Sequence, residues 1–445
     1  MSLFSALTTS VTGLNAQQIA IGNIAENVAN ASTAGYKQIN TAFESLVFSN
    51  GTFQEPGDVA AISTYQNDVG GNVVQTQEVT NLAINGDGFF VVKGPPASNV
   101  NGQEVFDAND YYTRAGDFTV NANGYLVNSA GYTLEGYPLN NQSGALTGTT
   151  VQPIQVPNQQ SVPVGTSIVS LLANLPSSSA LVGSTDYTAP SPVTETIYDS
   201  VGNAHTVSIQ FNHTATDTWT ATVTATGDTS NGGAPSSTVL DLAFGNGTTG
   251  PAGTLVGITA GAGSTGTTPT ISAAGAGNPA NVTFGWNFGQ GAQAVQLGLG
   301  EYQSTSGLTE FAGSSVNVAS ESQNGYAAGT LSGLSIDKNG YVNLTYTNGQ
   351  SIKAAQVAIA QFNAPDQLGR IDGTAFQQTV DSGNALVGTP GENGSGQISP
   401  SSVEQSNVDI STELTKLVQA QQVYSSNARV ITVADQMLQT LTQIS

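Results

Sequence analysis

The sequence predicts a mainly β protein with an α-helix at each end, and three observations support this fold class. The first and last stretches carry apolar residues at alternating three- and four-residue steps, which is typical of helices that pack on one another. The middle is rich in Gly, Thr, Ser and Asn, with short alternating segments and turn signals. An almost uncharged stretch interrupts that middle region. We therefore expect nested, discontinuous domains: paired terminal helices forming a coiled-coil inner domain, and β-rich middle and outer domains.

The N-terminal helix is expected over residues 3–30. Its only charged side chain is Glu26, and the rest of its polar surface is mostly Thr, Asn and Gln. A solitary surface helix normally carries pairs of opposite charges, so this helix is expected to have packing partners on more than one side. The residues expected in its packed seam, which serves self-assembly, are Leu7, Val11, Leu14, Ile21 and Val28.

The C-terminal helix follows Ser406-Asn407-Val408-Asp409, a Ser-x-x-acidic pattern that marks helix starts. Each terminal helix would run ~40–50 Å at about 1.5 Å per residue, longer than a small β domain can cover. We therefore expect the two helices to pack together and against further helices. The alternative is two unrelated amphipathic helices that lie on the β body. The expected seam of the second helix is Leu417, Tyr424, Ile431, Leu438 and Leu441, with Val430 and Met437 widening it.

The middle of the chain is predicted to be strands and turns. Asn123-Gly124 and Asn339-Gly340 lie between alternating segments, which is the signal of a β-hairpin. Between about 166 and 319 the composition changes to Ser, Thr and Gly, as expected of an insertion. We assign residues 1–35 and 405–445 to the helical inner domain, 36–165 and 320–404 to a linker and the β-rich middle domain, and 166–319 to the inserted outer domain.

Composition and charge exclude several function classes. The net charge of −22, with no Lys or Arg between Arg114 and Lys338, argues against nucleic acid and anionic membranes as partners, because both attract basic patches. The chain has no cysteine, so neither disulfides nor thiol chemistry are available. No apolar run is long enough to span a membrane. The first residues lack the pattern of a signal peptide, so export would have to proceed without a cleaved signal peptide, through a dedicated secretion apparatus.

No motif in the sequence points to catalysis. Gly261, Gly263 and Gly266 satisfy the spacing of a dinucleotide-binding loop, but no buried strand precedes them and no helix follows. His205 and His213, the two histidines, have no spacing that suits a zinc site. We therefore expect no catalytic residues, no cofactor and no metal. A pair of carboxylates for glycoside hydrolysis stays open, because proximity in the fold is not visible in a sequence.

Two terminal motifs resemble the signatures of the flagellar rod and hook family. The first runs from Asn27 to Lys37 and the second from Ser406 to Ile410, followed by Ala420-Gln421 and Asn427-Ala428. Two further stretches, 81–90 and 112–138, are similar to the β domain that this family shares. The residues that carry the terminal motifs are Asn27, Asn30, Ser32, Thr33, Gly35, Tyr36, Lys37, Ser406, Asn407, Val408 and Asp409.

The inserted stretch is similar to the outer domain of the hook branch of this family, on residues 197–205 with Trp219 and on residues 324–331. The resemblance implies a structural subunit without enzymatic activity. It would be exported by the flagellar type III apparatus and would polymerise outside the cell into a curved tube, with the helices innermost. That tube would act as a universal joint carrying torque from rod to filament. The implied partners are further copies, rod proteins, a hook-cap scaffold and hook-filament junction proteins. A distal rod subunit is the near alternative, and a secreted β-rich adhesin or glycan-active enzyme is the distant one.

Overall fold

The computed structural model divides the chain into two units. The helix-bearing unit comprises residues 1–158, 331–345 and 349–445, and the inserted unit comprises residues 159–330 with 346–348. The residues described are 3–46, 48–50, 53–55, 58–96, 98–100, 103–140, 144–157, 160–232 and 236–444.

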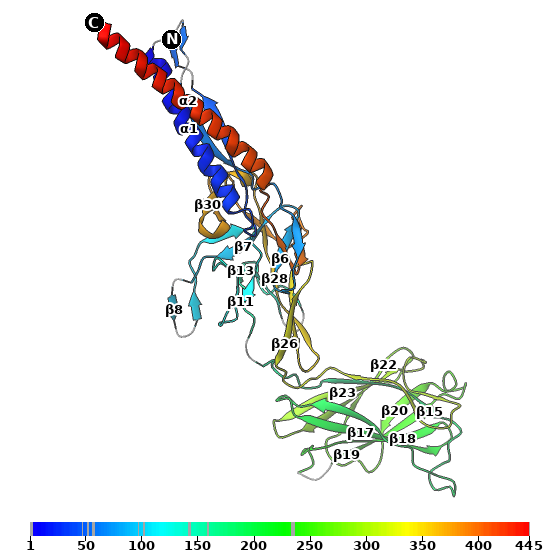
Figure 1. Cartoon of the computed structure of the whole chain (residues 1–445). Coiled ribbons are helices and arrows are strands. Elements are labelled where there is room, and N and C mark those ends of the chain that lie inside the picture. The colour runs from blue at the N-terminus through cyan, green and yellow to red at the C-terminus, as the bar shows by residue number, and fades with distance from the viewer. Residues whose placement is uncertain are drawn as a thin grey trace. The chain divides into compact units, whose positions relative to one another are not determined.

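Two helices, α1 (Leu3–Ala29) and α2 (Ile410–Ile444), lie side by side in the helix-bearing unit (Figure 1). The predicted mainly β fold with terminal helices is therefore confirmed. The first hydrogen bonds of α2 are formed by Asp409, whose side chain accepts from the Thr412 N–H at 3.1 Å and whose carbonyl accepts from Glu413 N–H at 2.9 Å. Asp409, and not Ser406, is thus the N-cap, because its short carboxylate reaches the first free backbone donors.

A long hairpin packs against α1. Its strands β1 (Ile39–Ser45) and β4 (Val59–Tyr65) pair in antiparallel register from Ile39 opposite Tyr65 to Ser45 opposite Val59. The hairpin continues through β2 (Phe48–Asn50) and β3 (Phe53–Glu55). The helix pair therefore has a β arm on one side, which the sequence did not indicate.

The β body of the helix-bearing unit is a large sheet of long and short strands. Among the described residues its main strand order is β26-β27-β28-β13-β7-β10-β31-β30. Its core includes Phe89, Val91, Tyr112 and Phe376, all nearly inaccessible to solvent. The predicted hairpin turns at Asn123 and Asn339 join strands of this body. Its strands on that path are β7 (Phe89–Lys93), β10 (Asp110–Thr113), β13 (Thr133–Pro138), β26 (Leu331–Ile336), β27 (Tyr341–Tyr346), β28 (Ser351–Val357), β30 (Gly369–Ile371) and β31 (Ala375–Gln377).

Shorter strands complete this unit. Two of them, β5 and β6, pair with β34 and β33 respectively, which brings the segment before α2 against the start of the β body. The remaining elements are β5 (Val73–Gln75), β6 (Leu82–Asn85), β8 (Ser98–Val100), β9 (Gln103–Val105), β11 (Thr119–Val120), β12 (Leu126–Val127), β14 (Gln152–Pro153), β29 (Ile359–Gln361), β32 (Leu386–Gly388), β33 (Gln397–Pro400) and β34 (Ser402–Glu404), with the short 3-10 helices η1 (Pro365–Gln367) and η2 (Asp372–Thr374).

The inserted unit is a β-sandwich. One sheet has the order β16-β17-β18-β19-β20 and the other β21-β22-β23-β15-β24, with β25 also paired to β15. Alternate residues of both sheets point into one apolar core that contains Trp219 and Trp286. The strands are β15 (Ile168–Pro176), β16 (Val193–Tyr198), β17 (Ala204–Ala215), β18 (Thr218–Ala225), β19 (Ser237–Phe244), β20 (Leu255–Ala260), β21 (Thr270–Ile271), β22 (Pro279–Asn287), β23 (Ala292–Glu301), β24 (Thr309–Phe311) and β25 (Asn317–Gln323).

The described residues of 226–281, a stretch rich in Gly, Ser, Thr and Ala, are part of this sandwich and not a lobe of their own. Leu240, Leu242 and Leu255 from β19 and β20 lie in the same core as Trp219. The expectation that no buried strand precedes Gly261 was wrong, because β20, with its buried Leu255, ends just before it. The next element after Gly266 is the strand β21 and not a helix, so the glycine spacing has a turn-forming role.

A buried carboxylic acid in the β body gives a pH-dependent prediction. Burial raises the pKa of Glu135 from 4.5 to about 7, with Lys93 opposing that shift. The folded state therefore binds more protons than the unfolded chain between these pH values, so stability is lost as pH rises from about 5 to 8. Glu135→Gln should remove that loss, which amounts to on the order of 1–3 kcal/mol between pH 5 and pH 8.

Urea unfolding followed by circular dichroism at pH 5 and pH 8 measures this effect. Tryptophan fluorescence supplies an internal control, since both tryptophans of the chain lie in the inserted unit. That signal should be the same in both proteins. Equal pH dependence of the circular dichroism transition in wild type and variant would contradict the role given to Glu135.

Candidate assembly surface on the helix pair

The contact between α1 and α2 is built from small side chains. The fully buried positions of α1 include Ser10, Ala16 and Ala20, and those of α2 include Ala420 and Ala434. Gly13 lies so close to α2 that an added Cβ would sit 3.0 Å from Asn427 Nδ2. Small residues at these positions let the two helices approach closely, and they leave larger apolar side chains for other contacts.

The large residues of the predicted seams lie at the margins of this contact. Leu7, Leu14, Ile21 and Val28 of α1 are half-buried, as are Leu417, Ile431 and Leu438 of α2. Val11 is 46% exposed and Tyr424 43% exposed, while the side chain of Leu441 falls outside the described residues. The pair contact of α1 therefore runs along a line of small residues beside the seam that the heptad pattern indicated.

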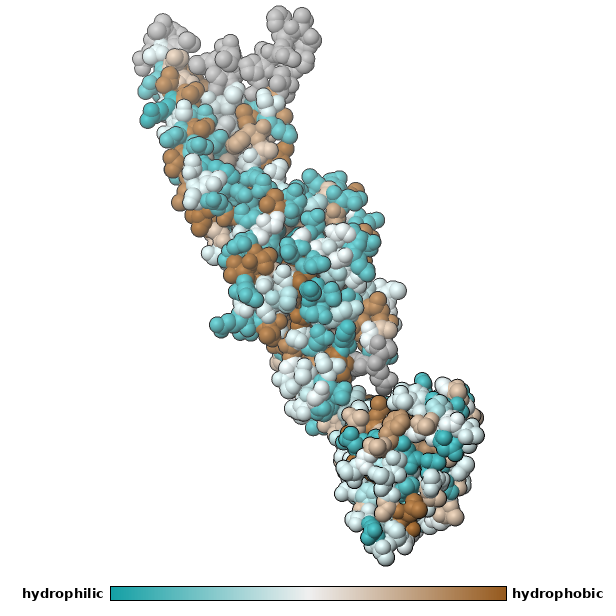
Figure 2. Space-filling model, turned by 90° about the vertical axis from the view of Figure 1, so that its right-hand side faces the viewer, coloured by the Kyte–Doolittle hydropathy of each residue, from teal (hydrophilic) through white to brown (hydrophobic). Residues whose placement is uncertain are grey.

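Seven large apolar side chains of α2 are exposed and are spread around the exposed surface of the helix. Each of them is between 43% and 54% exposed. The charged residues of α2 are Glu413, Lys416, Arg429 and Asp435, too few to keep such a surface well hydrated. Figure 2 shows apolar patches on the helical end of this unit. We call this set of exposed residues the α2 stripe; it consists of Ile410, Leu414, Val418, Val423, Val430, Val433 and Met437.

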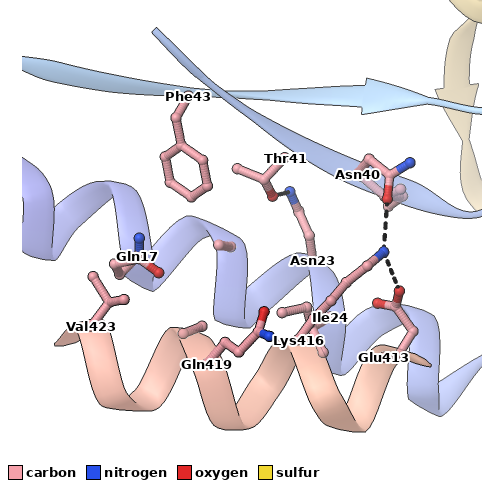
Figure 3. A pocket seen from close by; sticks show the side chains of 13 residues that line it. Gln17, Asn23, Ile24, Asn40, Thr41, Phe43, Glu413, Lys416, Gln419 and Val423 are labelled. Atoms are coloured by element: carbon pink, nitrogen blue, oxygen red, sulfur yellow. Dashed lines mark hydrogen bonds and ion pairs between the residues drawn. The ribbon is translucent and has the colours of Figure 1, made fainter. Parts of the chain in front are cut away.

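An open hollow of about 340 Å³ lies where α1, α2 and β1 meet (Figure 3). Ala20, Ile24 and Ala420 form an apolar part, and Phe43, itself 49% exposed, lies on its rim. On the polar side, Asn23 Nδ2 donates to Thr41 Oγ1 at 2.8 Å. The hollow can accept an apolar side chain from outside while its polar groups stay hydrogen-bonded.

Asn27 joins three elements at the end of α1. Its Nδ2 donates to the Ile39 carbonyl at 2.7 Å and to Glu413 Oε2 at 3.0 Å. Its Oδ1 accepts from the Ile39 N–H at 2.9 Å and from the Tyr36 hydroxyl at 3.2 Å. Because the side chain is fully buried, an unpaired amide here would be costly. Asn27 therefore fixes α1, β1 and α2 relative to one another.

Glu413 anchors the first turn of α2. Its carboxylate is 1% exposed and accepts from Asn27, from Gln38 Nε2 at 2.7 Å and from Lys416 Nζ at 2.7 Å. Lys416 also reaches Asn40 Oδ1 at 3.3 Å, as the dashed lines of Figure 3 show. The start of α2 is thereby tied to the segment that links α1 to β1.

A buried ion cluster connects the helix pair to the β body. Glu404 accepts from Lys37 Nζ at 2.6 Å, from Arg114 Nη1 at 3.1 Å and from the Gly71 N–H at 2.8 Å. The side chains of Lys37, Arg114 and Glu404 are at most 3% exposed. Burial lowers the pKa of Lys37, and the neighbouring Glu404 carboxylate opposes that shift. We call these three residues the ion cluster.

The other residues of the terminal motifs have local roles or lie at the surface. Gly35 has φ +67°, and a Cβ on it would meet Ala115 N at 2.3 Å, so only glycine fits there. Asn407 Oδ1 accepts from the Gln38 N–H at 2.7 Å. Three motif residues have shorter-range or surface positions: Thr33 donates to Asn30 Oδ1, Ser406 Oγ accepts from the Val408 N–H, and Ser32 is exposed.

Comparison with known proteins identifies the chain. Four family models match successive parts of the chain. Residues 7–37 match the flagella basal body rod protein model, and residues 83–168 match the flagellar hook protein FlgE/F/G D1 domain model. Residues 174–326 match the flagellar basal body protein FlaE D2 domain model, and residues 399–444 match the flagellar basal body rod FlgEFG protein C-terminal model. Flagellar hook protein FlgE of Rhizobium meliloti is 30% identical over 455 residues, covering 100% of both chains. The chain belongs to the flagellar hook protein family. Hook proteins FlgE of Escherichia coli and Salmonella typhimurium are 30% and 29% identical, over 99% of this chain and 100% of theirs.

Three of the matched stretches of this hook-family chain meet at the ion cluster. Lys37 is the last residue of the first stretch, Arg114 lies in the second, and Glu404 lies in the last one. The sequence motifs contained Lys37 and Asn27, but the carboxylates that they contact, Glu404 and Glu413, were missed. A usable signal was present: in a chain with 9% charged residues, each charge inside or close to a terminal motif is a candidate for a buried pair.

The described residues of this hook-family protein contain no group of three or more His, Asp or Glu side chains arranged to hold a metal ion. None of its described helices is long and apolar enough to cross a membrane. His213 stacks on Trp219 at 4.7 Å between ring centroids, and Trp219 donates to Glu310 at 3.0 Å. These polar groups of the inserted unit take part in core packing.

Proposed function

We propose that the chain polymerises through its terminal helices into a curved, flexible tube that transmits torque from the flagellar rod to the filament. As a member of the flagellar hook protein family, it is a structural subunit of the hook, a part of the flagellum outside the cell. The observation that carries the proposal is the α2 stripe, the set of apolar side chains on α2 that the rest of the described chain leaves partly uncovered.

Covering this stripe with other subunits supplies the driving force for assembly. Full burial of one such side chain stabilises by roughly 1.5–3 kcal/mol, and the stripe contains seven of them. The hollow beside Phe43 gives a second contact point for apolar side chains of a neighbour. The scarcity of charges on α1 and α2 then becomes an advantage, because few ionised groups have to be dehydrated in the tube.

The ion cluster and Asn27 suit a subunit that carries torque. The ion cluster connects the helix pair to the β body, and Asn27 connects α1 to α2 and β1. Both do so through buried hydrogen bonds, including bonds to charged groups, which hold geometry better than exposed contacts. Glu26, the only charge of α1, adds an ion pair to Arg370 at 3.3 Å. We assign residues 1–35 and 405–445 to the inner part of the tube, 36–165 and 320–404 to its wall, and 166–319 to an outer domain.

The family supports several finer proposals. We infer export through the flagellar type III apparatus, and contacts with rod proteins, a hook-cap scaffold and hook-filament junction proteins. We propose no enzymatic role, no cofactor and no metal. The full-length relatives named above are hook proteins and not distal rod proteins, which favours the hook over the rod alternative. An adhesin function would not explain why the apolar residues of the α2 stripe are exposed.

Immunogold electron microscopy of intact flagellated cells tests the proposed location. An antibody against the chain should decorate a short curved segment between the cell body and the filament. Cells that lack the gene serve as the control and should show neither label nor filament. Label along the filament itself, or on a straight rod segment, would contradict the hook assignment.

A further inference from the structure

Three ionisable side chains come together on adjacent strands of the β body, away from the helix pair. Lys93 on β7 lies directly opposite Asp110 on β10 and opposite Thr133 on β13. Glu135 is two residues beyond Thr133, so it lies on the same face of the sheet as Lys93. Three neighbouring antiparallel strands thus each contribute one ionisable group to the same face of the sheet: β7 an amine, and β10 and β13 a carboxyl group each.

The contacts within this group are close. Lys93 Nζ forms an ion pair with Asp110 Oδ1 and lies 4.0 Å from Glu135 Oε1. It also donates to the Ala108 carbonyl at 3.1 Å, which holds the amine against the start of β10. The Glu135 side chain is 1% exposed and that of Lys93 14% exposed. Glu135 Oε2 is buried without a hydrogen-bond partner in the described part of the chain.

The surroundings favour the uncharged form of Glu135. Val91 and Tyr112, the next residues on the same face of β7 and β10, belong to the apolar core of the body. Burial raises the pKa of Glu135 to about 7, so a large share of it is a neutral acid near neutral pH. A neutral buried acid beside an amine and a carboxylate can move protons between them.

We propose that Lys93 and Asp110 form an intramolecular amide bond, with Glu135 as the proton-transferring residue. The Nζ atom attacks Cγ of Asp110, a C–N bond forms, and the C–O bond to the departing oxygen breaks. Glu135 carries two protons, one after the other, from the ammonium group to that oxygen, which leaves as water. One ammonium and one carboxylate become one amide and one water, with no oxidant, reductant or co-substrate.

The bond would tie β7 to β10 covalently and close the connection 94–109 that joins them. Both strands are central in the sheet order, so the tie would resist separation of these strands under mechanical load. In a chain without cysteine, it would take the part that a disulfide takes in other secreted proteins. The inference does not depend on how the chain polymerises.

Intact-mass spectrometry of the full-length protein tests the proposal. The wild type should be lighter than its sequence mass by one water molecule. Trypsin should cut after Lys37 and Arg114 but not after Lys93, leaving 38–114 as one peptide that lacks one water. Lys93→Arg and Glu135→Gln should both restore the full mass. Lys338→Arg, which changes an exposed lysine in a hairpin turn, should keep the loss of water.

Three results would overturn the proposal. An ordinary ion pair gives a wild type of full mass that trypsin cleaves after Lys93. Cyclisation of an aspartate on its own backbone also loses water, but that loss would persist in Lys93→Arg, and trypsin would still cleave the wild type after Lys93. If Glu135→Gln lost water to the same extent as the wild type, Glu135 would not take part in the reaction.

Discussion

Replacing Glu404 by Gln is expected to destabilise the helix-bearing unit by on the order of 3–5 kcal/mol. This is the usual effect of removing one charged partner of a buried ion pair. The variant keeps the shape of the side chain but leaves Lys37 and Arg114 as two buried cations without a counter-charge. Urea unfolding of the full chain measures the loss. Tube formation should fail as well, because the cluster connects the helix pair to the β body.

Two matched variants sharpen this prediction. Glu78→Gln removes an exposed carboxylate of the same unit and should change stability by less than about 0.5 kcal/mol. The double variant Lys37→Met/Glu404→Gln removes one of the two buried cations that would lack a counter-charge. It should recover part of the lost stability. If Glu404→Gln unfolded at the same urea concentration as the wild type, the ion cluster would not hold the unit together.

Placing charges on the α2 stripe is expected to abolish polymerisation without unfolding the subunit. Val418 and Met437 are 53% and 54% exposed, so Val418→Asp/Met437→Asp leaves the contacts of the monomer largely intact. In a tube, each copy would lose roughly 1.5–3 kcal/mol per apolar contact and would have to dehydrate two carboxylates at further cost. Sedimentation and negative-stain electron microscopy measure polymer yield.

The control for this variant lies in the inserted unit. Thr216→Asp adds a carboxylate at an exposed position of the β17–β18 turn and should still give tubes. Unfolding curves for both variants should match the wild type. Normal tubes from Val418→Asp/Met437→Asp, or a monomer that is already unfolded, would contradict the role of the α2 stripe.

The sequence was sufficient for the elements whose signals are local. Heptad spacing predicted both terminal helices, and Asn-Gly pairs predicted hairpin turns. Both kinds of element could be predicted because they are determined by residues close together in the chain. The line along which α1 meets α2 was not predicted, because Ala and Ser are weak hydrophobic markers although they permit close packing. The N-cap at Asp409 shows the same limit, because the Ser-x-x-acidic pattern indicated a helix start but not which of its residues caps the helix.

The candidate site depended on long-range pairing that a single sequence does not contain. Lys37 and Glu404 are separated by most of the chain, and β5 and β6 bring them together by pairing with β34 and β33. The triad of Lys93, Asp110 and Glu135 likewise exists only through the register of three strands. The motifs from Asn27 to Lys37 and from Ser406 to Asp409 indicated where to look but not which carboxylates complete the contacts.

Electron cryomicroscopy of the native polymer, with a helical reconstruction in which the chain can be traced, tests the central claim most directly. We predict that α1 and α2 lie at the smallest radius, with the α2 stripe covered by neighbouring subunits and residues 166–319 at the largest radius. A reconstruction in which the helices face solvent, or in which the inserted unit forms the inner wall, would contradict assembly through the terminal helices.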